Sequence, residues 1–251
     1  MSDESIDQNI DGDHNIQVAG DLNVNIAGVD PKDHAEVLAE NKILKEKLAM
    51  LESTDSKNPS PEEKQAADDA LKSAEKMNQL GASIDPMNEF LLGRAAIVTG
   101  HLREAEIYLN RALLEFEKTE HHHNTGGVLN ELGYLAHVRG ELDQAKTFYN
   151  RSLKFAEEHS TTTAQAAILG NLSQVAQTQM LYPDATDFLK RALELTEGTT
   201  DQETRANVYS QLANIAYQQL NWDEAESYWR KSKSIYDEIP SPTFGDLQGL
   251  A

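Results

Sequence analysis

The segment NELGYLAHVRGELDQAKTFYNRSL (130–153) recurs along this 251-residue chain at a step of 40 residues. Three further segments share its pattern: residues 89–113, 170–193 and 210–233. The step carries Leu132 to Leu172 and Ala145 to Ala185. Because the spacing is the same each time, with no insertion, the central part of the chain is built from internal repeats.

Each repeat has the pattern of two helices joined by a short turn. In the quoted repeat, Leu129, Leu132 and Leu135 recur at helical spacing. Gly140 then stands where glycine ends a helix in a left-handed conformation at little cost, and Asp143 follows where it caps or charges the next N-terminus. One such unit cannot bury its apolar stripe alone, so the units must stack into a solenoid.

Small residues mark the places where the two helices of a repeat cross. Gly133 lies midway along the first helix of the quoted repeat, and Ala145 lies midway along the second. The equivalents of Gly133 in the other repeats are also small: Gly93, Ser173 and Ala213. A larger side chain at such a crossing would overpack it, at a cost of about 1–3 kcal/mol. The sequence therefore predicts close helix contacts inside every repeat.

These repeats resemble the tetratricopeptide repeat (TPR) family over residues 86–237. The second repeat matches the family pattern through Leu132-Gly133, Gly140, Ala145, Tyr149 and Ser152-Leu153. The third and fourth repeats depart from it, with Met180 and Leu220 at the turn glycine. The 40-residue step is similar to the longer repeats of kinesin-light-chain-like TPR proteins.

The resemblance implies an all-α superhelical solenoid of about four helix-turn-helix repeats, and unrelated helical hairpins are the alternative. Residues 61–81 predict a helix that caps the solenoid, because Pro61 and the glutamates after it suit a helix start. Residues 238–251 carry Pro, Gly and Ser without periodicity, which is typical of a flexible tail.

Residues 31–52 carry a heptad pattern that predicts self-association. Its core positions after His34 are Val37, Asn41, Leu44, Leu48 and Leu51. Leucine at d with a lone asparagine at a favours a parallel two-stranded coiled coil, in which Glu40 would face Lys45 of the partner chain. The alternative is an amphipathic helix lying on its own domain, because further apolar residues broaden the stripe.

A smaller repeat with a step of eight residues precedes the heptads, over residues 12–18 and 20–26. Apolar and polar residues alternate there, as in β-strands, with Ile16, Val18, Val24 and Ile26 on one face. An isolated hairpin is marginal in water, so we expect it to become stable by pairing with other copies. A disordered acidic tail is the alternative. Residues 53–60 then predict a linker.

In TPR solenoids the first helices line a concave groove that takes peptides or helices. Carried over by register, this resemblance implies a partner-binding groove made of Arg94, Ile97, Asn130, Tyr134, His137, Gln174, Gln177, Asn214 and Tyr217. Most of these are neutral hydrogen-bonding groups, which can bind an extended backbone along its length. The alternative is that they are solvated, or covered by the tail of the same chain.

Composition excludes several classes of function. Forty-two acidic and 22 basic residues leave a net charge of −20, which opposes binding to nucleic acid or to an anionic membrane surface. The chain has no cysteine, and it lacks the common catalytic, nucleotide-binding and zinc-binding motifs. We therefore expect no enzymatic activity, no cofactor and no metal.

The sequence thus predicts a non-enzymatic, cytoplasmic adaptor that self-associates through its N-terminal segment and binds a protein or peptide partner in the TPR groove. The alternative is a structural subunit that assembles into a ring or filament.

Overall fold

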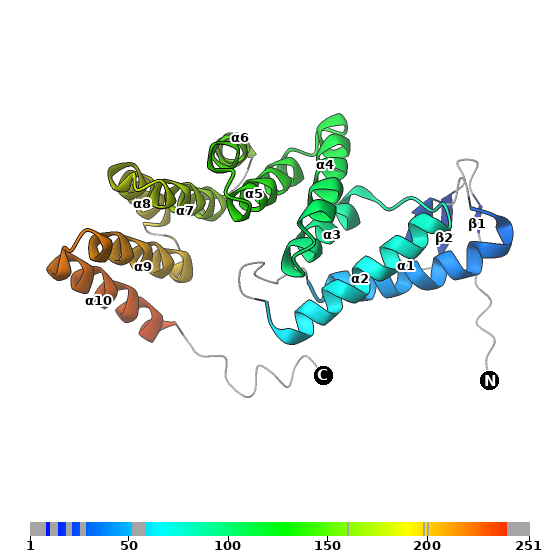
Figure 1. Cartoon of the computed structure of the whole chain (residues 1–251), viewed down its shortest axis with the longest axis horizontal. Helices are drawn as coiled ribbons and strands as arrows, with labels where there is room; N and C mark the ends of the chain where they lie inside the picture. Colours follow the sequence, from blue (N-terminus) through cyan, green and yellow to red (C-terminus); the bar gives the residue numbers. More distant parts are fainter. Residues whose placement is uncertain are drawn as a thin grey trace. The chain divides into compact units, whose positions relative to one another are not determined.

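The computed structural model describes residues 9–10, 15–18, 22–25, 29–51, 59–159, 161–197, 199 and 201–239. The chain divides into two compact units, Met1–His121 and His122–Ala251. Figure 1 shows the helices of both units in sequence colours. This division falls between the first and second repeats, a boundary that the 40-residue pattern does not indicate. Among the described helices, none combines the length and the apolar character that a membrane crossing requires.

The first unit contains a small antiparallel sheet and four helices. The strands are β1 (Asn9–Ile10), β2 (Asn15–Val18) and β3 (Leu22–Asn25), in the order β1-β2-β3. A 3-10 turn (Pro31–Asp33) leads into α1 (His34–Ala49), which is followed by α2 (Pro61–Gln79), α3 (Pro86–Val98) and α4 (Leu102–Lys118). The start of α2 is a capping box, in which Ser60 and Glu63 each bind the backbone N–H of the other.

The predicted strand segments lie partly within the described residues. Ile16 of β2 stands opposite Val24 of β3, and Val18 stands opposite Leu22. Ile26 lies outside the described residues. The pairing of β1 with β2, which puts Ile10 opposite Ile16, was not predicted, because residues 9–10 precede the eight-residue repeat.

The apolar heptad positions of α1 are buried within the chain itself. Val37, Leu44 and Leu48 join residues of α2 such as Ala70 in one hydrophobic core, and Leu51 just beyond α1 joins them. Asn41 is also buried. A coiled coil between two chains through these residues would have to pull α1 off α2. The structure therefore corrects the coiled-coil prediction and agrees with the alternative, a helix that lies on its own domain.

The charges beside the heptad positions are paired with α2 as well. Lys76 Nζ lies 2.8 Å from a carboxylate oxygen of Glu36 and 2.7 Å from one of Glu40. The hydrogen bond from Lys76 lowers the pKa of the Glu40 carboxyl. Lys47 lies 3.6 Å from Asp69. Glu40 therefore pairs with a lysine of its own chain, whereas the coiled-coil prediction paired it with a lysine of a second chain.

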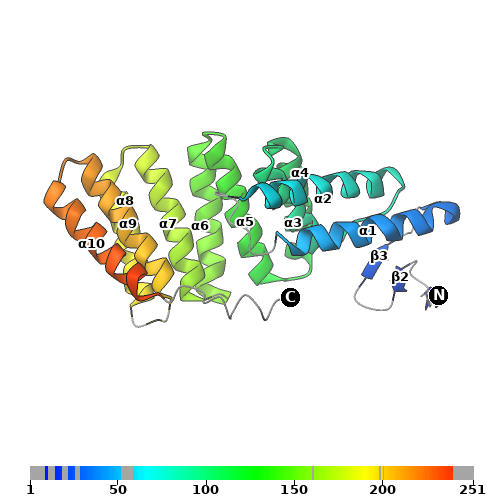
Figure 2. The same ribbon diagram turned by 90° about the horizontal axis from the view of Figure 1, so that it is seen from below.

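The described part of the second unit forms three successive helical hairpins, which Figure 2 shows side by side. They are α5 (His122–Val138) with α6 (Leu142–His159), α7 (Thr162–Thr178) with α8 (Tyr182–Thr196), and α9 (Gln202–Gln218) with α10 (Trp222–Glu238). The second helix of each hairpin packs on the first helix of the next, α6 on α7 and α8 on α9. The first helices α5, α7 and α9 also contact one another in order. These contacts make the second unit a solenoid.

The predicted close crossings are confirmed. A Cβ atom added to Gly133 would lie 2.6 Å from Cδ1 of Tyr149, and one added to Gly93 would lie 2.5 Å from Cγ of Leu109. No real Cβ tolerates such distances, so each glycine is what lets the large residue of the second helix reach the core. Ser173 and Ala213 are fully buried at the same position of the later repeats.

The turns inside the repeats share a left-handed residue. Gly100 and Gly140 have φ values of 80° and 78°. Met180 and Leu220, which replace the glycine, keep the same conformation with φ values of 60° and 64°. The repeat geometry thus imposes a positive φ even on residues that carry a side chain, for which that region is unfavourable.

Candidate functional site

The first helices of the second unit carry seven of the nine predicted groove residues. We call the surface that α5, α7 and α9 form with these residues the first-helix face. Its members are Asn130, Tyr134, His137, Gln174, Gln177, Asn214 and Tyr217. The other two predicted residues, Arg94 and Ile97, lie on α3 in the first unit, where Ile97 is buried. The candidate site described below is therefore confined to the second unit.

Two of the predicted residues connect neighbouring helices. Asn171 Nδ2 on α7 donates to Asn130 Oδ1 on α5 at 2.9 Å. His137 Nε2 lies 3.2 Å from Thr178 Oγ1, which joins the same two helices farther along. Both pairs are 41 residues apart, one more than the repeat step. Asn130 and His137 therefore hold α5 against α7, a role that a search for equivalent positions at 40 residues does not detect.

Other members of the face leave their polar groups available. Among the described residues, the side-chain amides of Gln174 and Asn214 have no hydrogen-bond partner, whereas Gln177 Nε2 donates to Ser173 Oγ at 3.2 Å. Asn214 is exposed and Gln174 is partly exposed. These two amides, on adjacent first helices, can offer a donor and an acceptor each to a bound backbone.

An aromatic group lies at the α9 end of the face. Half of the Tyr217 side chain is exposed, and its ring centroid lies 5.0 Å from that of Trp222 and 5.7 Å from that of Trp229. The sequence prediction included Tyr217 but not the tryptophans, because they belong to α10 and only first helices were considered. Rings of this kind supply large contact areas at little entropic cost.

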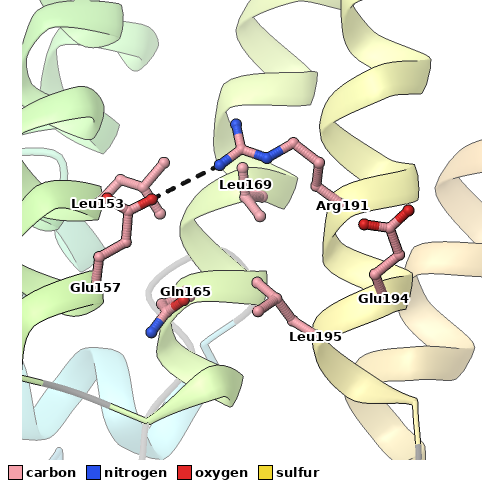
Figure 3. Close-up of a pocket in the computed structure, with 7 residues that line it drawn as sticks. All are labelled: Leu153, Glu157, Gln165, Leu169, Arg191, Glu194 and Leu195. Atoms are coloured by element: carbon pink, nitrogen blue, oxygen red, sulfur yellow. Dashed lines mark ion pairs between the residues drawn. The ribbon is translucent and has the colours of Figure 1, made fainter.

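A separate cleft lies between α6, α7 and α8. Figure 3 shows Leu153, Leu169 and Leu195 on its walls and Arg191 reaching toward Glu157, whose carboxylate lies 3.6 Å from the guanidinium. Its volume is about 260 Å³. This ion pair joins α8 to α6.

The same cleft recurs 40 residues later, between α8, α9 and α10, with a volume of about 500 Å³. There Lys231 replaces Arg191, and its Nζ lies 5.4 Å from the ring centroid of Tyr209 and 5.5 Å from that of Tyr228. Because equivalent residues line both clefts, they follow from the stacking of the repeats. In the described part of the chain, no cluster of three His, Asp or Glu side chains is placed to hold a metal ion.

The first unit contains a buried acid at a core position. Glu89 of α3 is one 40-residue step before Leu129, and its side chain is 4% exposed. Arg111 of α4 lies 2.6 Å from its carboxylate. Burial raises the pKa of Glu89 to about 7, and the nearby acids Asp85 and Glu115 add to the shift while Arg111 opposes it.

Comparison with known proteins identifies the repeats. A family model described as tetratricopeptide repeat matches residues 125–198 and 162–238. The matched range, residues 125–238, includes all of α6 to α10 and most of α5. No curated protein sequence matches the chain.

Several solved structures have a similar fold. BtubC (BKLC) from P. vanneervenii has 14% sequence identity and a TM-score of 0.57, over 85% of this chain and 96% of that one. A putative kinesin light chain from Podosopora anserina with TPR-like repeats has 13% identity and a TM-score of 0.60, over 82% and 97% of the two chains. MamA from Desulfovibrio magneticus RS-1 has 12% identity and a TM-score of 0.58, over 82% and 98%. At these identities the likeness concerns the fold alone.

Proposed function

We propose that the TPR repeats of this chain act as a non-enzymatic adaptor and bind an extended segment of a partner protein along the first-helix face. One observation carries the proposal. Among the described residues, the side-chain amides of Gln174 and Asn214 on adjacent helices have no hydrogen-bond partner, and the exposed ring of Tyr217 lies on the same helix as Asn214. Neutral amides suit the repeating N–H and C=O groups of an extended backbone. The tyrosine adds contact area at one end.

The chemistry of the face favours a partner segment of low charge. None of its seven members is an acid, a lysine or an arginine. A strongly charged segment would lose solvation on this face without gaining an opposite charge. A segment with polar backbone contacts and one bulky apolar side chain near Tyr217 fits the arrangement better.

Binding tests this proposal directly. The full chain is purified from its native cell with its partner, the bound segment is mapped by cross-linking, and its affinity is measured by calorimetry. Replacing Gln174, Asn214 and Tyr217 by alanine together is expected to weaken binding at least tenfold. The control replaces the exposed residues Asn150 and Lys190 on the second helices by alanine. Equal affinity for both variants would reject the first-helix face as the binding site.

The proposal also includes self-association through the N-terminal segment, restricted to the strand region. Because α1 is engaged with α2 in the same chain, the segment left for pairing with other copies is the strand region that ends at Asn25. Light scattering compares the full chain with a chain that begins at Val29 and keeps α1. An equal mass for the two chains would reject this contribution, and open-ended growth of the full chain would favour the structural subunit instead of the adaptor.

A further inference from the structure

The last helix of the second unit exposes a row of aromatic side chains. Among the described elements, α10 contacts only α9 (Figure 1). Its Trp222, Trp229 and Tyr236 are 54%, 41% and 42% exposed. Residues seven apart lie on one side of a helix, about 10 Å from each other along the axis. We call these three residues the aromatic seam.

The residues equivalent to Trp229 and Tyr236 in the earlier repeats are buried, whereas those equivalent to Trp222 are half-buried: Leu102, Leu142 and Tyr182. Leu109, Tyr149 and Leu189, which precede Trp229 by multiples of 40, are fully buried. Thr196, equivalent to Tyr236, is 1% exposed. In the earlier hairpins of this unit, the first helix of the next hairpin packs on the second helix, as α9 packs on α8. At the positions of Trp229 and Tyr236 the repeat thus has a packing surface, and among the described helices only α9 packs on α10.

The residues beside the seam differ from their equivalents in the earlier repeats at one position, and this difference indicates the kind of surface that binds the seam. Leu113 and Leu153 are buried and Leu193 is partly buried at the position where the fourth repeat has Lys233. Glu226 is the residue one heptad before Lys233, on the same side of the seam. In helices that pair with one another, charged residues flank the apolar row that makes the contact. The aromatic seam has this pattern, because one acid and one base flank it.

We propose that α10 is a self-association helix, and that the aromatic seam packs against the same seam of a second copy in an antiparallel arrangement. Trp222 and Tyr236 are each seven residues from Trp229. A two-fold axis at Trp229 therefore places Trp229 of one copy against Trp229 of the other. It also places Trp222 of each copy against Tyr236 of the other. A surface that repeats in this way is self-complementary, as an isologous dimer requires.

The charges beside the seam agree with this orientation. About a two-fold axis at residue 229, Glu226 lies three positions before the axis and Lys233 lies four positions after it. The acid of each copy therefore comes beside the base of the other, on both sides of the axis. Within one chain, Glu226 and Lys233 form only exposed pairs, with Arg230 at 2.7 Å and Asp237 at 2.6 Å. Such pairs contribute little, so exchanging them for contacts between copies costs little.

The test measures the mass of the full chain by light scattering and sedimentation over a concentration series. Trp229→Lys places two ammonium groups on the axis, and it is expected to halve the mass relative to the unchanged chain. Ser227→Lys, an exposed change on another side of α10, is the control and is expected to leave the mass unchanged. Circular dichroism verifies that each variant is folded.

Charge reversal tests the orientation without touching the seam. Glu226→Lys is expected to weaken association at least tenfold, because the ammonium group that it introduces in each copy lies beside Lys233 of the other. Adding Lys233→Glu is expected to restore it, since the pairs are then reversed on both sides. Removing residues 1–28 is expected to leave the seam association intact, which separates it from pairing through the strands.

Three results would overturn the proposal. The first is a monomeric chain at every concentration in which Trp229 fluorescence is shielded, which would mean that residues 240–251 cover the seam. The second is a monomer with a solvated Trp229, which would mean that the seam is uncovered or awaits a different protein. The third is an oligomer whose mass is unchanged by Trp229→Lys, which would place the contact elsewhere.

Discussion

The second and fourth repeats have a large aromatic residue at the same position, but the residue is fully buried only in the second repeat. Tyr149 of α6 fits over Gly133 and is fully buried, whereas Trp229 of α10 is 41% exposed. The helices around the two residues have the same lengths to within one residue, and both repeats match the TPR model. Two differences accompany this. Tyr149 lies over Gly133 of its own hairpin, where the fourth repeat has Ala213, and α7 packs on α6 whereas no described helix packs on α10 except α9.

This comparison shows that the repeat pattern determines which side of a helix is apolar, while the residue at the crossing and the packing of the next hairpin together determine how far that side is buried. In the second repeat the buried ring is part of the core and contributes to the stability of the unit. In the fourth repeat an equally large residue contributes less to folding and is available for association. Stability and binding are thus divided between equivalent positions of one solenoid.

The largest expected effect follows directly from this difference. Tyr149→Ala is expected to lower the free energy of unfolding by about 4 kcal/mol, because it leaves a cavity under a fully buried ring. Trp229→Ala is expected to cost only about 1 kcal/mol in the monomer, because the ring is partly solvated. Urea unfolding, measured at concentrations where the chain is monomeric, gives both values.

Tyr149→Phe is the control for the first change. The Tyr149 hydroxyl is buried and has no hydrogen-bond partner among the described residues, so its removal is expected to cost nothing or to stabilise slightly. If Trp229→Ala destabilised the monomer as much as Tyr149→Ala, the fourth repeat would have a core like that of the second, and the comparison would be wrong.

The sequence alone predicted the repeat core well because its signals are local. The 40-residue step, the small residues at the crossings and the glycines of the first two turns each depend on contacts within one hairpin. The α1 helix shows the limit of such signals. Val37, Leu44 and Leu48 have a spacing that suits both a second chain and α2 of the same chain. The contacts that distinguish the two, such as those of Lys76 with Glu36 and Glu40, depend on the tertiary fold.

The candidate site was predicted less completely for a related reason. The resemblance to the family indicated the first helices, and it therefore found Gln174, Asn214 and Tyr217. It did not find the contact of Asn130 with Asn171, because that hydrogen bond joins positions that are not equivalent in the repeat. Nor did it find the exposure of Trp229, since exposure depends on tertiary packing, and among the described helices only α9 packs on α10.

The second largest effect extends the comparison to the first repeat, where Glu89 replaces the core leucine. The pKa of this carboxyl is raised to about 7 in the fold, above its ordinary value of 4.5. The folded chain therefore holds the proton more tightly than the unfolded chain does. The stabilisation is fully present below pH 4.5 and is lost as the pH rises to 7, by up to about 3 kcal/mol.

Glu89→Gln tests this pH dependence, because it keeps the size of the side chain and removes its titration. Unfolding free energies of both chains are compared from pH 4 to pH 8, and the difference between them is expected to grow with pH in favour of the variant. Glu104→Gln, a change at an exposed acid of α4 that does not contribute to the shift at Glu89, is the control. A constant difference between the two chains would contradict a raised pKa at Glu89.

A smaller effect is expected at the crossing itself. Gly133→Ser introduces a Cβ atom 2.6 Å from the Tyr149 ring, and it is expected to cost about 2 kcal/mol. The third repeat already has Ser173 opposite Leu189, and both are fully buried. Combining Gly133→Ser with Tyr149→Leu therefore copies the third repeat into the second, and it is expected to recover most of the loss. If the pair were no better than the single change, the crossings of the two repeats would not be equivalent.

The smallest effect concerns the turns that distinguish the early repeats from the late ones. Met180 and Leu220 are largely exposed and have positive φ values, so their side chains contribute strain and little packing. Replacing either by glycine is expected to raise the free energy of unfolding by about 0.5–1 kcal/mol, since the relief of strain exceeds the entropy that glycine adds to the unfolded chain. Gly140→Ala, the reverse change in the second repeat, is expected to lower it by a similar amount. Unchanged stability on replacing Leu220, together with a loss of association, would mean that the turn beside the aromatic seam is part of the contact between copies.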